Sequence, residues 1–339
     1  MGRFMEKRKL GKQGLEVSAI GFGCMGLSHA YGAALNEHDF REVVVAAINA
    51  GHTFFDTAEV YGTPEQPHHN EEMLGKILPE YRNQLVIATK CGLTFDTSAD
   101  VTPYPVIPDS RPESIRKAVE GSLQRLHTDY IDLYYQHRSD PKVEPEVVAE
   151  TMKDLIKEGK ILYWGVSEAP ADYIRRAHSV CPISAIQNRY SMMARWHESL
   201  FPLLEELGIG FVAFSPLANG LLSNQYTKDS HFDKSNDYRA SMAQFQPESY
   251  EQNTQLLKLL TDLAAKKQAT PAQIALAWVM AQRPWIVPIP GTRNLQRVRE
   301  NAQAAEVKLE AEELQSINQQ LEHMSMSGVF GGTKITERK

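Results

Sequence analysis

The feature that most restricts the fold of this chain is a regular alternation of short apolar runs with amphipathic stretches. Such runs are typical of parallel strands buried on both faces, and the stretches between them are typical of covering helices. Eight runs follow one another without a break in composition, which favours a closed (β/α)8 TIM barrel over an open doubly wound α/β sheet. The runs lie at residues 19–23, 52–58, 84–90, 129–137, 160–167, 184–188, 210–217 and 285–291.

Capping residues mark the ends of several intervening helices. Asn36 suits the N-cap of a helix that ends at Gly51, and Thr270 suits that of a helix running to about Gln282. We expect further helices to begin near Asn70 and Ser110 and to cover 145–158, 170–179 and 196–208.

Three segments lie outside this alternation. LGKQG, between short strands, predicts an N-terminal β-hairpin over 7–18 that plugs the floor of the barrel. The loop after the seventh strand, 218–250, is polar and long, which is typical of functional or mobile loops. A C-terminal helix and tail, 303–339, follow the barrel at 19–302, and the last dozen residues resemble a loose tail. We expect a single domain over 1–339.

Composition argues against several classes of function. The net charge is −6 and no strongly basic stretch stands out, so we expect no nucleic-acid partner. No apolar run reaches the roughly 18 residues of a membrane-spanning helix, and the basic N-terminus lacks the apolar segment of a secretory signal. The three cysteines are widely spaced, which fits free thiols in a reducing cytoplasm.

Residues 19–26, AIGFGCMG, contain the G-x-G-x-x-G spacing of a dinucleotide-binding fingerprint. A Rossmann fold needs a helix that begins at the glycines and an acidic residue about 20 positions later. Here the helix signal starts only near Asn36, and Asp56 comes thirty residues after Gly26. We therefore interpret the glycines as a sharp turn at the mouth of the first strand.

Ionisable side chains end several of the predicted strands, where active sites of parallel α/β folds lie. Asp56, Lys90 and His137 end three strands, and Tyr61 follows shortly after the first of them. A Lys beside a Tyr lowers the phenol pKa, and a Tyr so tuned can pass a proton to a carbonyl oxygen. The hydride would then come from a nicotinamide cofactor. On spacing alone, a structural Asp56–Lys90 ion pair remains an equal alternative.

These residues stand in contexts that resemble the aldo-keto reductase superfamily, in the family's order from about residue 8 to 320. GFGCMGLS, YYQHR and GVSEAP are most similar to the bacterial and plant branch that reduces aldehydes and ketones with NADPH. The resemblance implies a barrel that binds NADPH in an extended pose without a Rossmann domain. The matching segments are FFDTAEVYG (54–62), SLQRLHTDYIDLYYQH (122–137), GKILYWGVSE (159–168), AIQNRYS (185–191), VAFSPLANGLL (212–222) and IPGTRNLQRVREN (289–301).

The resemblance also implies roles for the residues at matching positions. Tyr61 would be the general acid, tuned by Lys90 and Asp56, and His137 would orient the carbonyl. NADPH/NADP+ would be held by residues of the first strand mouth, the nicotinamide pocket, the pyrophosphate stretch and the adenosine end: Gly23, Cys24, Met25, Asp56, Ser167, Gln187, Phe214, Ser215, Pro216, Leu217, Asn219, Gly220, Leu221, Ile289, Gly291, Thr292, Arg293, Arg297, Glu300 and Asn301.

Two guanidiniums at the adenosine end, Arg293 and Arg297, favour the 2′-phosphate of NADPH over NADH. The chain departs from the family at Glu168, where many members have Asn, and at Phe214, where many have Tyr. The segment 63–70 is longer than usual, and its adjacent histidines lack a third ligand, so we expect no metal.

We expect an NADPH-dependent oxidoreductase that reduces a small aldehyde or ketone to an alcohol. Two alternatives remain open from the residues. A Schiff-base aldolase could use Lys90, although the segment 289–301 would then have no role. A cofactor-sensing regulatory subunit of the same fold is compatible with an intact tetrad. The loops that set specificity in this architecture leave the substrate and the oligomeric state open.

Overall fold

The computed structural model describes residues 5–99, 101 and 103–338. Its main sheet has eight parallel strands in the order β12-β11-β10-β9-β8-β5-β4-β3. Backbone bonds from Gly21 N to Pro288 O (2.9 Å) and from Gly23 N to Pro290 O (3.2 Å) join the two edges of the sheet, so the barrel is closed. Each predicted apolar run overlaps one strand, and β5 and β10 each end one residue beyond the predicted run. The strands are β3 (Phe22–Gly23), β4 (Phe54–Asp56), β5 (Val86–Cys91), β8 (Ile131–Gln136), β9 (Ile161–Ser167), β10 (Ala185–Arg189), β11 (Gly210–Phe214) and β12 (Ile286–Pro288).

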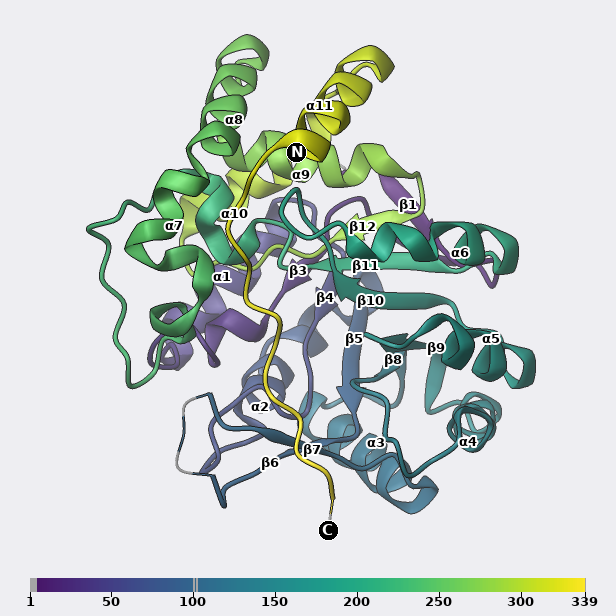
Figure 1. Cartoon of the computed structure of the whole chain (residues 1–339). Coiled ribbons are helices and arrows are strands. Elements are labelled where there is room, and N and C mark those ends of the chain that lie inside the picture. Colours follow the sequence, from purple (N-terminus) through teal and green to yellow (C-terminus); the bar gives the residue numbers. More distant parts are fainter. Residues whose placement is uncertain (1–4, 100, 102, 339) are drawn as a thin grey trace.

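Helices surround the sheet (Figure 1). The two predicted caps form, because Asn36 Oδ1 accepts from Asp39 N at 2.9 Å and Thr270 forms a capping box with Gln273. Among the described residues, none of the helices has the length and apolar character that a membrane crossing requires. The predicted helices are α1 (Glu37–Asn49), α2 (His69–Gly75), α3 (Pro112–Leu126), α4 (Pro145–Lys157), α5 (Ala171–Val180), α6 (Phe201–Leu207) and α9 (Pro271–Gln282).

Two helix starts differ from the prediction. Asn70 does not begin α2 as a cap, because its buried side chain donates to Cys24 O (3.0 Å) and Ser28 Oγ (2.6 Å). The expected helix over 196–208 is divided into the 3-10 turn η3 (Trp196–Leu200) and α6. Pro202 lies in the first turn of α6, where a missing N–H is tolerated, so the α-helix begins there.

The N-terminal hairpin forms as predicted. Strands β1 (Lys7–Leu10) and β2 (Leu15–Ser18) pair antiparallel, with Leu10 opposite Leu15. Their buried side chains, including Leu10 and Val17, pack in one cluster with inward-facing barrel residues such as Phe54. The hairpin therefore closes the barrel interior at the end opposite the carboxyl ends of the strands.

Several elements were not predicted from local periodicity, and most of them lie in connections. The segment 92–109 contains an antiparallel hairpin, and the stretch 218–250 contains short turns rather than an open loop. The additional elements are β6 (Leu93–Phe95), β7 (Val106–Pro108), α7 (Pro247–Gln252), α8 (Thr254–Lys267), α10 (Leu295–Gln303) and the 3-10 turns η1 (Met25–Leu27), η2 (Leu78–Gln84), η4 (Ala218–Ser223), η5 (Tyr238–Ser241), η6 (Ala243–Phe245) and η7 (Ala304–Glu306). The expected C-terminal helix is present as α11 (Ala311–His323).

The described C-terminal residues are not the loose tail that the sequence suggested. Phe330 N donates to Gln244 Oε1 at 3.0 Å, and Ile335 forms a β-bridge with Val106 of β7. Arg338 then pairs with Asp109. Figure 1 shows this segment running from α11 to the β6–β7 hairpin. The expectation was wrong because these partners lie far away in the sequence, where local composition gives no signal.

Candidate active site

The four side chains singled out from the sequence at or shortly after predicted strand ends lie together at the carboxyl ends of β4, β5 and β8. They are Asp56, Tyr61, Lys90 and His137. Lys90 Nζ donates to Asp56 Oδ1 (2.5 Å), to Thr57 O (2.7 Å) and to Tyr61 Oη (3.2 Å). The His137 ring stands edge-on to the Tyr61 ring, with 5.7 Å between their centroids. The structure thus places a cation, a carboxylate, a phenol and an imidazole around one point of the barrel mouth.

The Lys90 ammonium is completely withdrawn from solvent. An ammonium has three N–H donors, and here each has an oxygen acceptor, which offsets the loss of hydration. The parallel register of β4 and β5 sets Asp56 opposite Ala88, two residues before Lys90, so both side chains face the same interior. The ion pair is therefore fixed by two adjacent strands.

The pKa of Tyr61 differs from the sequence-based prediction. Burial raises the pKa of Tyr61 above its ordinary value of 10.0, and this desolvation outweighs the opposing effect of Lys90. The prediction of a lowered pKa was wrong because the sequence identifies the cation but not the depth of burial. The phenol is protonated at neutral pH, which is the form that donates a proton.

Lys90 is charged, whereas His137 is neutral. Burial alone would lower the pKa of Lys90, but the interactions with Asp56 and Tyr61 have the larger effect, so that the pKa stands above its ordinary value. A Schiff-base lysine must be a neutral amine, and this environment opposes that state. Burial, reinforced by Arg138 and Lys90, lowers the pKa of His137 well below 6.5, so the imidazole is neutral.

Ser167, the last residue of β9, and Gln187, within β10, lie near the same end of the barrel. Gln187 Nε2 donates to Asp56 Oδ2 at 2.7 Å, which occupies the second carboxylate oxygen. Ser167 Oγ accepts from Arg138 Nη1 at 2.9 Å. Phe214, at the end of β11, lies with its ring centroid 5.0 Å from the Arg189 guanidinium carbon. These three side chains form the wall adjacent to the Asp56–Lys90 pair.

The segment after β11 is a tight turn with an unusual number of left-handed residues. Ser215, Ala218, Asn219 and Gly220 have φ values of 49°, 48°, 61° and 104°. Two of its backbone N–H groups donate within the turn, from Ala218 to Ser215 O and from Gly220 to Leu217 O, both at 3.0 Å. The turn includes three residues of the predicted cofactor set, Ser215, Asn219 and Gly220.

The residues predicted for the adenosine end lie around the start of α10. Arg293 donates hydrogen bonds to the carbonyl oxygens of Gly26, Gly32 and Ala33. These bonds fix the position of the loop that follows β3. Arg297 is partly exposed in the first turn of α10. Glu300 Oε1 accepts from Thr270 Oγ1 at 2.7 Å. Thr292 Oγ1 accepts from the N-cap residue Asn294.

Some side chains of the predicted cofactor set do not face the mouth. The Cys24 thiol lies in the core with its Sγ 3.7 Å from Phe22 O, and its burial raises its pKa strongly. Any cofactor contact from this residue would use its backbone. Besides Asp56, Ser167 and Gln187, the other members with buried side chains are Pro216, Leu221, Ile289 and Asn301. Met25, Leu217 and Gly291 are at least partly exposed.

Gly23 is required by a close approach of two backbone segments, which the interpretation of the glycines as a sharp turn did not include. A Cβ at Gly23 would lie 2.7 Å from Ile289 O, too close for a side chain. A Cβ at Gly291 would in turn lie 2.4 Å from Gly23 O. The clearance therefore serves the backbone approach of β3 to the segment after β12. No Rossmann helix follows, because only the short turn η1 stands before α1.

Sequence reasoning missed three side chains at the mouth. His29 stacks on Tyr61 with 6.0 Å between ring centroids and a 16° interplanar angle, and its Nδ1 donates to Gly62 O at 2.6 Å. Arg138 and Arg189 are the others. Arg138 directly follows His137, so its strand-end position was an available signal. His29 gave none, because it lies in a loop whose course is set by distant contacts.

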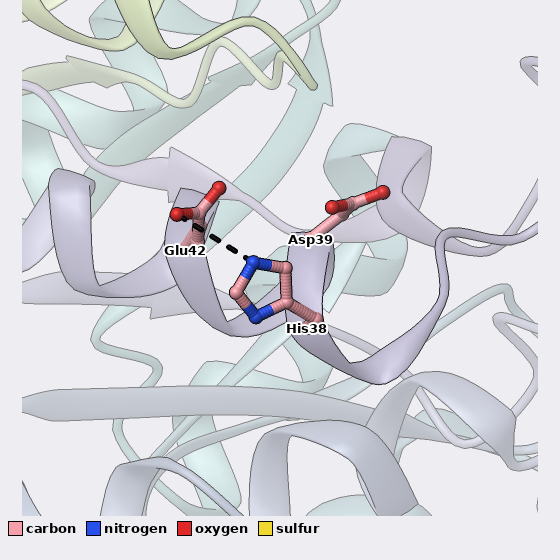
Figure 2. A group of neighbouring side chains, drawn as sticks. All are labelled: His38, Asp39 and Glu42. Carbon is pink, nitrogen blue, oxygen red and sulfur yellow. Dashed lines mark ion pairs between the residues drawn. The ribbon is translucent and has the colours of Figure 1, made fainter.

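One group of metal-ligating side chain types occurs within the described residues, and it lies apart from this site. His38, Asp39 and Glu42 are exposed in the first two turns of α1 (Figure 2). His38 Nε2 lies 3.8 Å from Glu42 Oε1, and Asp39 Oδ2 accepts from the N-cap residue Asn36. These contacts are those of a capped, solvated helix end. In the loop 63–70, His68 Nδ1 instead donates to Glu59 O at 2.6 Å.

Comparison with known proteins gives consistent similarities along the chain. The family model described as the aldo/keto reductase family matches residues 19–322. A probable aldo-keto reductase 1 from Glycine max is 41% identical over 326 residues, which cover 96% of this chain and 90% of that protein.

Two solved structures match the fold over nearly their whole length. A glycerol dehydrogenase from Gluconobacter oxydans has a TM-score of 0.83 and 27% identity, covering 96% of this chain and 98% of its own. The holo form of an aldo-keto reductase from Bacillus halodurans has a TM-score of 0.75 and 30% identity, with the same coverage of 96% and 98%.

Proposed function

Because the chain belongs to the aldo/keto reductase family, we propose that it reduces aldehydes and ketones to alcohols with NADPH. The observation that carries this proposal is the contact of Lys90 Nζ with Asp56 Oδ1 and Tyr61 Oη at the barrel mouth. A protonated phenol beside a neutral imidazole is suited to bind and protonate a carbonyl oxygen. A cytoplasmic location agrees with three buried free thiols.

In the proposed mechanism, Tyr61 and His137 hold the carbonyl oxygen of the substrate between them. When bound, a nicotinamide supplies the hydride to the carbonyl carbon. Tyr61 gives its phenolic proton to the oxygen, which leaves a phenolate and an alcohol. Lys90 stabilises that phenolate, and Asp56 keeps Lys90 charged and in place. The phenolate recovers its proton from solvent before the next turnover.

The residues present suit NADPH along the whole mouth. Ser167 and Gln187 offer polar groups for a carboxamide, and Phe214 offers an aromatic face. The turn after β11 would hold the pyrophosphate, as the family resemblance implies, and Arg297 suits the 2′-phosphate. Among these, the arginine is the residue that distinguishes NADPH from NADH.

The test of the function is NADPH consumption by the purified chain with a panel of aldehydes, ketones and quinones, followed by absorbance, with NADH as the control. Oxidation of NADPH that depends on the carbonyl compound supports a reductase. A folded protein that binds NADPH but turns over none of the panel contradicts the proposal and favours a cofactor-binding regulatory subunit.

Arg297→Ala is expected to raise the KM for NADPH by about tenfold while the KM for NADH stays unchanged. The reason is the loss of a charge-assisted hydrogen bond to the 2′-phosphate, which typically contributes about 1.5–3 kcal/mol. Initial rates with each cofactor measure the effect. Arg299→Ala, at an exposed position on the same helix, is the matched control. Equal changes with NADPH and NADH would contradict the assignment.

The pH profile of aldehyde reduction is expected to be flat on both sides of neutrality. The pKa of Tyr61 lies above 10.0, so the acid stays protonated until the pH exceeds that value. The pKa of His137 lies well below 6.5, so the imidazole stays neutral down to acidic pH. Measurement of kcat/KM from pH 6 to above 10 checks this. A decline near pH 7 would instead indicate a phenol with a lowered pKa.

A further inference from the structure

Two arginines at the barrel mouth have no role in the proposed mechanism. Strand β8 ends one residue before His137, and Arg138 follows His137. Arg189 is the last residue of β10. Arg189 is buried, and Arg138 is only partly exposed. Withdrawing a guanidinium from water costs free energy unless acceptors or an anion replace the water. Their partners therefore indicate whether the protein alone satisfies them.

The partners of both guanidiniums are neutral. Arg138 Nη1 donates to His137 O (2.6 Å) and to Ser167 Oγ (2.9 Å). Arg189 Nη1 donates to Asn219 Oδ1 at 3.3 Å, and its guanidinium carbon lies 5.0 Å from the ring centroid of Phe214. Neither arginine forms an ion pair within the described part of the chain. A guanidinium has five N–H donors, so both retain donors for a further acceptor.

Glu168 is the carboxylate that interacts with this pair, and it is already engaged. Its Oε1 accepts from the backbone N of Arg189 at 2.8 Å, and its Oε2 lies 3.4 Å from His197 Nε2. Electrostatic interactions link Arg138 to Glu168 and to Tyr61, and link Arg189 to Glu168 and Arg138. Two cations thus face one carboxylate, which leaves a net positive charge on the wall beside the proposed acid.

We infer that Arg138 binds a carboxylate of the substrate, and that the preferred substrates are short oxo acids, in which the carbonyl and a carboxylate share one small molecule. The inference rests on the proposed reductase function and names its substrate class. The Arg138 charge acts on both His137 and Tyr61, so a carboxylate held by this guanidinium leaves a nearby carbonyl close to both side chains. A planar guanidinium matches a carboxylate in bidentate geometry. Arg189 adds positive potential from β10, which is separated from β8 by β9.

The first test compares substrates on the unaltered protein. At saturating NADPH, kcat/KM is measured for 4-oxobutanoate, for its methyl ester and for butanal. We expect the acid to be preferred over the ester by at least about tenfold, since hydrogen bonds to charged groups contribute about 1.5–3 kcal/mol. Reduction of the ester as efficiently as the acid overturns the inference while leaving the reductase function intact.

The second test removes the charge. Arg138→Met keeps an unbranched apolar stem and is expected to lower kcat/KM for 4-oxobutanoate by about 10- to 100-fold, with less than about a threefold change for the ester. Arg138→Lys is expected to restore part of the loss. Arg175→Met is the matched control, because Arg175 is exposed and paired with Glu206 on the outside of the barrel. Equal losses on acid and ester would make Arg138 a structural tie between β8 and β9 and overturn the inference.

Binding measurements separate this inference from the proposed function. Succinate carries the carboxylate but has no aldehyde, and calorimetry is expected to detect its binding to the unaltered protein and at least tenfold weaker binding to Arg138→Met. This result supports the subsite even if no aldehyde is reduced. Titration of NADPH fluorescence is expected to give equal affinities for both proteins. A lower NADPH affinity in the variant would assign Arg138 to the cofactor and overturn the inference.

Discussion

Tyr61→Phe is expected to lower kcat for aldehyde reduction by about 10²- to 10⁴-fold, the usual contribution of a positioned general acid. The change removes the phenolic proton and leaves the ring, so its edge contact with His137 and its stacking with His29 are kept. The affinity for NADPH, measured by fluorescence titration, should stay within about twofold. Steady-state rates with an aldehyde at saturating NADPH measure the loss.

Tyr81→Phe is the matched control for this prediction, because Tyr81 lies in η2, before β5, and packs against a cluster of buried side chains that includes Phe40 and Leu78. It should retain full activity. Retention of activity in Tyr61→Phe would mean that another group donates the proton, and His137 would then be the nearest candidate. Loss of NADPH binding in the same variant would place the phenol in the cofactor site instead of at the substrate carbonyl.

The barrel was predictable because its information is local. Each strand is an apolar run of a few residues, and helix caps such as Asn36 and Thr270 satisfy their first-turn N–H groups from neighbouring positions. Strand ends in a parallel barrel meet at one mouth, so the contacts of Asp56 with Lys90 also followed from the pattern. Local periodicity and topology together were sufficient for these features.

Other features depend on distant partners or on burial, which a sequence pattern does not report. The β-bridge of Ile335 with Val106 joins residues far apart in the chain. The raised pKa of Tyr61 is an effect of desolvation that outweighs the expected influence of Lys90. The space that Gly23 leaves is filled by the backbone of Ile289, which only the closed barrel brings near. In each case three-dimensional packing decides between alternatives that the residues leave open.

The fully buried Asp56–Lys90 pair should make Lys90→Met one of the most destabilising single changes in the site. The variant removes the ion pair between Lys90 and Asp56. The hydrogen bond from Gln187 Nε2 to Asp56 remains, but it carries no opposite charge. Removal of one member of a buried ion pair typically costs about 3–5 kcal/mol of unfolding free energy, because the other charge stays uncompensated. Urea unfolding followed by fluorescence and circular dichroism measures this difference. Activity should also fall, since the cation that contacts the Tyr61 oxygen is lost.

The double variant Asp56→Asn/Lys90→Met distinguishes stability from catalysis. Asparagine is neutral and can keep the contact with Gln187, so we expect much of the lost unfolding free energy to return while activity stays low. In the single variant Lys90→Met, burial raises the pKa of the unpaired Asp56 carboxyl above its unfolded value. Protonation then favours the folded state, and the stability deficit should shrink as the pH falls. A single variant as stable as the unaltered protein would contradict the stabilising role of the ion pair. A double variant with restored activity would show that Lys90 does not support Tyr61 through its charge.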